Sequence, residues 1–129
     1  MGMFEWNKTL ELGVSEMDLE HKTLIKMMAS LEEAGIKNSS KEAIEKLIGE
    51  LASFTVKHFK DEETHMEKIG FSGLEVHKVI HQDLLDKFTK HVEAFKNGDG
   101  KISNDFLSFL KNWITAHIMY VDKKYTTPA

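Results

Sequence analysis

The sequence predicts an all-α fold, an up-down-up-down antiparallel four-helix bundle with an N-terminal arm, and three observations support this prediction. The chain has 129 residues and a single proline, Pro128, so almost its entire length is free of the strongest helix breaker. Glycine-containing breaks at 35–40, 70–73 and 97–100 separate four segments. In each segment apolar residues recur every three or four positions, as on one face of a helix, and strand alternation is not sustained anywhere.

The four segments carry signals for where the helices begin and end. The expected helices span residues 18–35, 41–67, 73–97 and 103–121. Ser39 or Ser40 can cap the second helix, because a short hydroxyl side chain accepts hydrogen bonds from the free N–H groups of a first turn. Ser103 or Asn104 can cap the fourth in the same way. Gly98 is suited to the end of the third helix. Short connections between long helices favour antiparallel neighbours.

The N-terminal arm is too apolar to be a free tail. Residues 1–17 include five large apolar side chains, which are Phe4, Trp6, Leu10, Leu12 and Val14. We expect the arm to lie on the bundle and cover part of its surface, with partner binding as the alternative. The expected organisation is a single domain, with an arm over 1–17, a bundle over 18–122 and a tail over 123–129.

Composition excludes several classes of function. There are no cysteines, which rules out disulfides, iron–sulfur clusters and a cysteine nucleophile. The 17 basic and 21 acidic residues give a net charge of −4, which argues against a nucleic-acid partner. The N-terminus lacks the pattern of a signal peptide, and no apolar run is long enough to span a membrane. A cytoplasmic monomer without a membrane or nucleic-acid partner is therefore expected.

Seven histidines in so short a chain are unusual, and five of them are in register. His58 and Glu62 are four residues apart, as are His77 and His81, so each pair lies on one helix face. In every expected helix the histidine continues the apolar stripe that should face the core. Counting from loop centres near residues 38, 70 and 99 places all these groups at about the same height, within roughly 4.5 Å. The set comprises His21, His58, Glu62, His77, His81, His117 and Asp122.

Such a cluster predicts a metal site. Buried ionisable groups are costly unless they are paired or bound to a cation. Five imidazoles and two carboxylates exceed the needs of one tetrahedral zinc ion, and they suit two divalent ions bridged by the carboxylates. Iron, manganese and zinc all accept this donor set. With a bridging hydroxide added, five histidines divide as three and two, which leaves one ion six-coordinate and the other with an open position.

These residues resemble a known family, the hemerythrins. Residues 58–66, HFKDEETHM, are similar to the hemerythrin segment H-F-x-x-E-E-x-x-M. The second histidine pair, the segment HIMYVD at 117–122 and the spacing between Asp18 and His21 match the other helices of that family. The resemblance covers nearly the whole chain. The arm with Trp6 and the segment around Trp113 resemble bacterial hemerythrins in particular.

The resemblance implies a centre of two iron ions. By this likeness His77, His81 and His117 bind one iron, and His21 and His58 bind the other. Glu62 and Asp122 bridge the two together with an oxo or hydroxo group. O2 would bind at the two-histidine iron, taking one electron from each iron and a proton from the bridging hydroxide. The implied function is reversible O2 binding for storage, transport or delivery, and not the catalysis of a reaction. Oxygen or redox sensing is one alternative, and peroxide or nitric oxide reduction is another.

Residues around the expected ligands are expected to form an O2 pocket and to orient the histidines. An apolar O2 pocket is expected from Leu24, Phe59, Trp113 and Ile114, with ordinary core packing as the alternative. Asp18 and Glu63 are candidates to orient ligand histidines through the free ring N–H. For Asp18 a role at the helix N-terminus is the alternative, and for Glu63 a solvated surface position.

Two histidines remain outside the set. His65 and His91 are expected at the surface. The spacing of Glu62 and His65 resembles the motif of ferritin-like di-iron proteins. Those sites require two such motifs and carboxylates from all four helices, whereas this chain has five histidines and two carboxylates in register. The ferritin-like alternative is therefore rejected.

Overall fold

The computed structural model describes residues 4–6 and 8–118, and over this range the chain is a bundle of four helices. A short 3₁₀ turn, η1, precedes them at Lys8–Leu10. The helices are α1 at Ser15–Ile36, α2 at Lys41–Lys68, α3 at Leu74–Lys96 and α4 at Asn104–Ala116. His117 and Ile118 continue α4 in the wider π-type geometry. The predicted all-α four-helix fold is confirmed, although α1 begins three residues earlier than expected.

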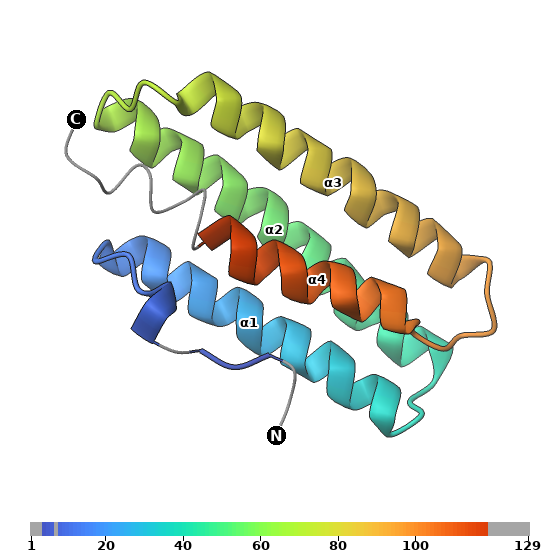
Figure 1. Ribbon diagram of the computed structural model, residues 1–129. Coiled ribbons are helices and arrows are strands. Elements are labelled where there is room, and N and C mark those ends of the chain that lie inside the picture. Colours follow the sequence, from blue (N-terminus) through green and yellow to red (C-terminus); the bar gives the residue numbers. More distant parts are fainter. Residues whose placement is uncertain (1–3, 7, 119–129) are drawn as a thin grey trace.

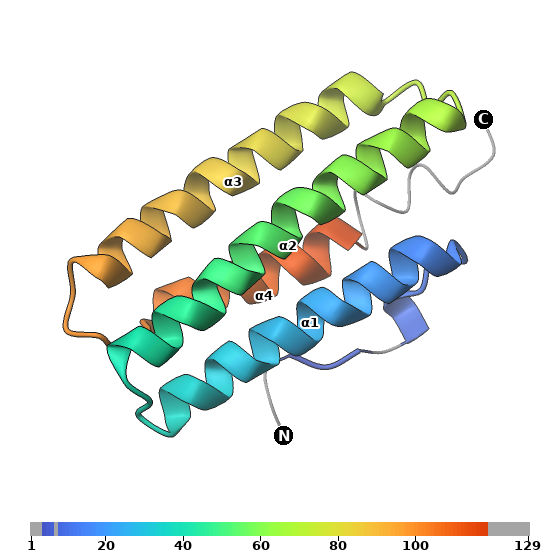
Figure 2. The ribbon, with the colours of Figure 1, turned by 180° about the vertical axis from the view of Figure 1, so that it is seen from behind.

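The four helices run up, down, up and down around one core. Figure 1 shows α4 in front, between α1 and α3, and Figure 2 shows α2 in front when the molecule is seen from behind. One end of the bundle therefore collects the beginning of α1, the end of α2, the beginning of α3 and the end of α4. The loops α1–α2 and α3–α4 lie together at the opposite end. This topology brings the histidine-bearing part of every helix to the same end.

Side-chain caps fix the beginnings of two helices as the sequence predicts. The Ser40 hydroxyl accepts a hydrogen bond from the Ala43 amide at 3.1 Å, and the Ser103 hydroxyl accepts one from the Phe106 amide at 3.1 Å. α3 ends at Lys96, and its C-cap residue Asn97 directly precedes Gly98. The Lys41 ammonium donates to the Lys96 carbonyl at 2.7 Å, so the start of α2 also satisfies the end of α3.

The core is continuous and extends beneath the arm. Buried aliphatic, methionine and aromatic side chains from all four helices fill the bundle. In the arm Phe4, Leu10 and Leu12 are buried against this core, and Trp6 is half-buried beneath the Lys22 ammonium. The described part of the arm thus packs on the bundle, as expected. Within the described residues, no helix has the length and apolar character needed to cross a bilayer.

Candidate metal centre

Five histidines converge on one carboxylate, Glu62, in the core near the end of the bundle where α2 meets α3. His21 comes from α1, His58 and Glu62 from α2, His77 and His81 from α3, and His117 from the π-type turn after α4. All six side chains are buried. The i, i+4 spacing sets each pair on one helix face, and the antiparallel topology brings the faces together. The predicted convergence is therefore present for every member of the set that the structure describes.

The two carboxylate oxygens of Glu62 divide the histidines into two groups. The Nε2 atoms of His77, His81 and His117 lie 3.3, 2.9 and 3.8 Å from Oε1. On the other side, the Nε2 atoms of His21 and His58 lie 3.4 and 3.5 Å from Oε2. We call these the three-histidine group and the two-histidine group. Each group with Glu62 is compact enough to share one cation.

Electrostatics keep Glu62 ionised despite its depth. Burial raises the pKa of Glu62, but hydrogen bonds from His117, His21, His77 and His81 outweigh burial and hold the pKa well below its usual range. A carboxylate that stays ionised in a dry core and is ringed by imidazole nitrogens has the donor chemistry that divalent transition metals bind. Each histidine group together with Glu62 therefore has the donors to hold a metal ion.

Asp122, the expected second bridging carboxylate, lies outside the described residues. Its expected helix, which extended to residue 121, is described as far as Ile118. The candidate metal donors within the described residues are therefore the five histidines and Glu62. The role of Asp122 remains a prediction from the sequence.

Two further carboxylates accept hydrogen bonds from candidate ligand histidines, at the ring nitrogen that faces away from Glu62. His58 donates its Nδ1–H to Glu20 Oε1 at 2.7 Å, and His81 donates its Nδ1–H to Glu63 Oε2 at 2.8 Å. A neutral ring with its proton held on Nδ1 would offer the Nε2 lone pair to a metal ion, in place of the hydrogen bond that Nε2–H makes to Glu62. Glu63 thus contacts a histidine as anticipated, rather than being only solvated.

Asp18 does not orient a histidine, and this expectation was wrong. Its carboxylate accepts hydrogen bonds from the Leu12 and Gly13 amides, at 2.8 and 3.1 Å, and so ties the arm to the first turn of α1. The alternative role near the helix N-terminus is the one it has. Glu20 takes the histidine instead. Sequence reasoning missed Glu20 because it lies one residue off the apolar stripe, on the side of α1 that faces α2.

The side chains expected to form an O2 pocket are all buried, and their contacts are those of the core. Leu24, Phe59, Trp113 and Ile114 belong to the core. The Phe59 ring stacks on His81, with centroids 3.9 Å apart and planes 5° from parallel, whereas its centroid is 5.9 Å from that of His58. Phe59 therefore packs on the three-histidine group. Packing is the role that its contacts support, and Trp113 meets its edge at 5.8 Å.

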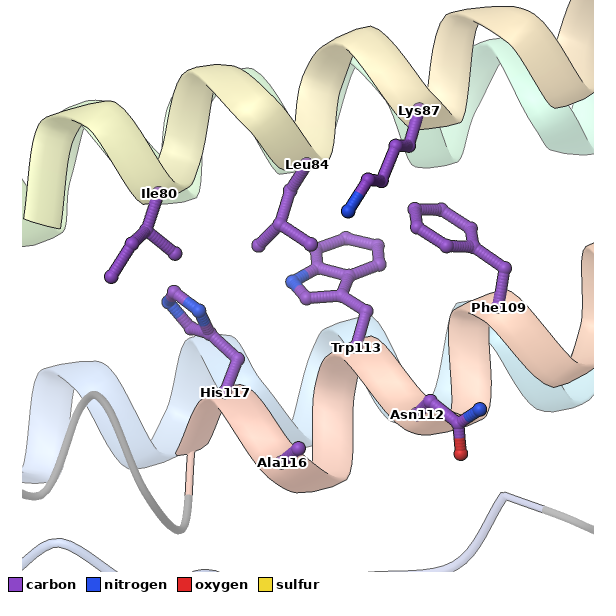
Figure 3. A pocket seen from close by; sticks show the side chains of 8 residues that line it. All are labelled: Ile80, Leu84, Lys87, Phe109, Asn112, Trp113, Ala116 and His117. Carbon is purple, nitrogen blue, oxygen red and sulfur yellow. The ribbon is translucent and has the colours of Figure 1, made fainter.

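An apolar groove of about 400 Å³ runs between α3 and α4 and reaches His117. Figure 3 shows Ile80 and Leu84 of α3 facing Trp113 and His117 of α4, with the Lys87 ammonium near the indole. Of the four residues expected around O2, only Trp113 lines this groove. The groove thus exposes one edge of the three-histidine group to an apolar surface.

The two remaining histidines are half-buried rather than at the surface. His91 stacks between Phe106 and Phe109, with centroids 5.2 and 4.9 Å away, far from the metal donors in sequence and toward the opposite end of α3. His65 lies in the last turn of α2 and does not belong to either donor group. Both are separate from the centre, as predicted, but the surface location was wrong.

Comparison with known proteins agrees with this geometry. Residues 12–127 match the family model described as Hemerythrin HHE cation binding domain. The chain is 32% identical over 127 residues to a bacteriohemerythrin of Methylococcus capsulatus, covering 97% of this chain and 95% of that protein. It is 30% identical over 122 residues to a myohemerythrin of Theromyzon tessulatum, covering 95% and 90%.

A solved structure extends the comparison to three dimensions. The crystal structure of a hemerythrin point mutant, with one leucine replaced by alanine, superposes with a TM-score of 0.87 at 29% identity. The match covers 97% of this chain and 95% of that one, so it extends over nearly the whole bundle. With five buried histidines grouped around one ionised glutamate, and with these relatives, the chain belongs to the hemerythrin family.

Proposed function

We propose that this protein binds O2 reversibly at a non-haem di-iron centre and serves oxygen storage, transport or delivery. The observation that carries the proposal is the unequal division of the histidines across the two oxygens of Glu62. A three-histidine side can saturate one metal ion, whereas a two-histidine side leaves a coordination position for a small diatomic ligand. The hemerythrin relatives support iron as the metal.

In this proposal each described donor has one task. His77, His81 and His117 hold one iron, His21 and His58 hold the other, and Glu62 bridges them. Asp122 is the proposed second bridge, with an oxo or hydroxo group as the third. Bound iron supplies the electrons and the open coordination position that O2 requires. Glu20 and Glu63 keep a proton on Nδ1 of their histidines, so that Nε2 remains free to bind metal.

The apolar surroundings suit a carrier more than a hydrolytic or oxidising enzyme. Met17 lies one turn before His21 and Met66 one turn after Glu62, and both are fully buried. With Leu24, these side chains keep bulk water from the centre. Exclusion of water limits the loss of peroxide and the irreversible oxidation of the metal ions. Sensing and reduction of peroxide or nitric oxide use the same donors and remain the alternative functions.

The optical spectrum of the iron-loaded protein tests the proposal. Protein reduced without air should develop a visible charge-transfer band when O2 is admitted, lose it under vacuum, and regain it over repeated cycles. The iron content should be two per chain. Rapid conversion to a stable oxidised spectrum, with turnover of added peroxide or nitric oxide, would contradict carriage and favour the alternative functions.

A further inference from the structure

We propose that Glu20 is a positioning residue that orients and electronically tunes His58, and that Lys57 holds its carboxylate in place. The inference rests on the proposed metal centre and deepens it, because it assigns separate control to the two-histidine group. It concerns the side of the centre where the open coordination position is expected. Neither Glu20 nor Lys57 belongs to the donor set that the hemerythrin likeness implies.

The geometry gives each oxygen of Glu20 its own partner. Oε1 accepts the Nδ1–H of His58 at 2.7 Å, and Oε2 lies 3.4 Å from the Lys57 ammonium. Lys57 is in turn anchored to Asp61 at 2.7 Å, one turn further along α2. The Glu20 side chain is 9% exposed, whereas that of Lys57 is 61% exposed. A buried carboxylate is thus fixed between a ligand histidine and a lysine at the surface.

The equivalent contact on the other side of the centre lacks this support. Glu63 accepts the Nδ1–H of His81 at 2.8 Å, but its side chain is 27% exposed. Among the described residues no lysine forms an ion pair with Glu63, and the His81 ring also stacks on Phe59. Both histidines therefore donate to a carboxylate, but the carboxylate at His58 is more buried and paired with a lysine, whereas His81 is held in addition by ring stacking.

The chemistry of the hydrogen bond determines what Glu20 can change. A carboxylate that accepts the Nδ1–H of an imidazole withdraws that proton partially and makes Nε2 a stronger donor. A stronger donor binds a divalent ion more tightly and stabilises the higher oxidation state of iron. Burial reduces solvent screening of the Glu20 charge, so the effect on His58 is larger than an exposed carboxylate would give. Asp61 belongs to the same network, because a hydrogen bond with Glu20 and another with Lys57 lower its pKa.

Zinc binding to the metal-free protein provides a test without redox chemistry. Glu20→Gln keeps an oxygen that can accept from His58 and removes only the charge, whereas Glu20→Ala removes both. We expect the weaker of the two zinc affinities to fall about 10-fold in Glu20→Gln and up to about 100-fold in Glu20→Ala. Glu16→Gln, the same substitution at an exposed position one turn earlier on α1, is the matched control, and its zinc affinities should stay within about twofold of the parent.

Nuclear magnetic resonance of the zinc protein, labelled with ¹⁵N-histidine, identifies which ring responds. Glu20→Gln should shift the Nδ1–H resonance of His58 and leave that of His81 in place. Glu63→Gln should do the reverse. A folded Glu20→Gln protein with an unchanged His58 resonance and unchanged zinc affinities would overturn the inference.

These readouts also separate the inference from the proposed function. The His58 resonance reports on Glu20 whether or not the iron protein carries O2. Reduction of the iron-loaded protein supplies a further readout, since Glu20→Gln should raise the midpoint potential of the centre above that of the parent. A midpoint potential that stays the same or falls would count against electronic tuning. Failure of the air and vacuum cycle with a normal His58 response would overturn the oxygen-carrier function alone.

Discussion

The two ends of the bundle are built from the same four helices but differ in the side chains that they bury. Toward the α1–α2 and α3–α4 loops, the core is filled by apolar side chains such as Leu31, Ile44, Leu51 and Phe106. Toward the α2–α3 loop, the same helix faces carry five histidines and Glu62, all buried. The helical periodicity does not change between the ends. Only the chemistry of the inward-facing positions changes, from methyl and ring carbons to nitrogen and oxygen donors.

This contrast indicates that stability and function are separated along the bundle axis. Burial of apolar area favours folding at one end, at roughly 25 cal/mol per Å². At the other end, polar groups are withdrawn from water and compensated only by one another or by a bound cation. The apolar end therefore holds the donors at one height, and metal binding completes the stabilisation of the polar end. Changes at each end should have distinct consequences.

The largest expected effect is on metal content, from a single donor of the three-histidine group. His117→Ala should lower iron from two per chain to about one, because the ion on that side loses one of its three imidazoles. Metal analysis and the visible spectrum would measure this. His91→Ala, at the other end of α3 and outside both donor groups, is the control and should retain two irons. Unchanged stoichiometry and spectrum in His117→Ala would contradict the site assignment.

Metal removal should have the next largest effect, and on stability. Zinc or iron bound only by the folded chain stabilises it by about 4 kcal/mol when free metal exceeds its dissociation constant about 1,000-fold. Unfolding by urea with zinc and with a chelator would give this difference. Equal stability in both conditions would show that the polar end is complete without a cation, and the contrast between the ends would fail.

A cavity at the apolar end should lower stability without changing the metal site. Leu51 is fully buried, so Leu51→Ala should reduce the free energy of unfolding by about 3 kcal/mol through lost burial and an unfilled cavity. Its metal content should remain that of the parent. Leu19, which is 66% exposed on α1, is the matched control, and Leu19→Ala should change stability by less than about 0.5 kcal/mol. Loss of iron in Leu51→Ala would show that the two ends are not separable.

The acid response of the metal-free protein should depend on Glu62. Because its pKa is lowered in the folded state, the stability that its ionised form contributes is complete above the ordinary glutamate pKa of about 4.3. That contribution is lost as the pH falls further, toward the lowered pKa, by about 1.4 kcal/mol for each pH unit. Urea unfolding of the parent and of Glu62→Gln at about pH 5 and about pH 3, on either side of the ordinary pKa, would compare the two. A parent that loses no more stability than Glu62→Gln over this interval would contradict the lowered pKa.

Much of this organisation could be predicted from the sequence because it depends on periodicity. Helix number, the Ser40 and Ser103 caps and the meeting of five histidines with Glu62 follow from 3.6-residue spacing and antiparallel topology. Contacts that depend on the rotamers of side chains on two different helices could not be predicted in this way. Glu20, for example, lies off the apolar stripe of α1, and its carboxylate accepts a hydrogen bond from His58 on α2.

Two further departures have the same origin. Asp18 turns toward the arm, where two backbone amides lie within reach, and so is unavailable to a histidine. Phe59 follows His58 in sequence, but successive helical residues point about 100° apart, and its ring packs on His81 of the neighbouring helix. In each case sequence proximity identified a neighbour of the centre, and packing between helices decided which histidine, if any, it touches.

The smallest expected effect comes from the beginning of α4, at the apolar end. Ser103→Ala removes the hydroxyl that accepts from the Phe106 amide and should cost about 1 kcal/mol in the free energy of unfolding, measured as a lower urea midpoint. Ser108, exposed in the middle of α4, is the matched control, because alanine is the better helix former there. Since α4 carries His117 at its far end, about four turns away, iron stoichiometry should be unchanged in both variants. If Ser103→Ala lost iron with so small a loss of stability, α4 would transmit its N-terminal disorder to the centre, and the apolar end would be part of the site rather than its support.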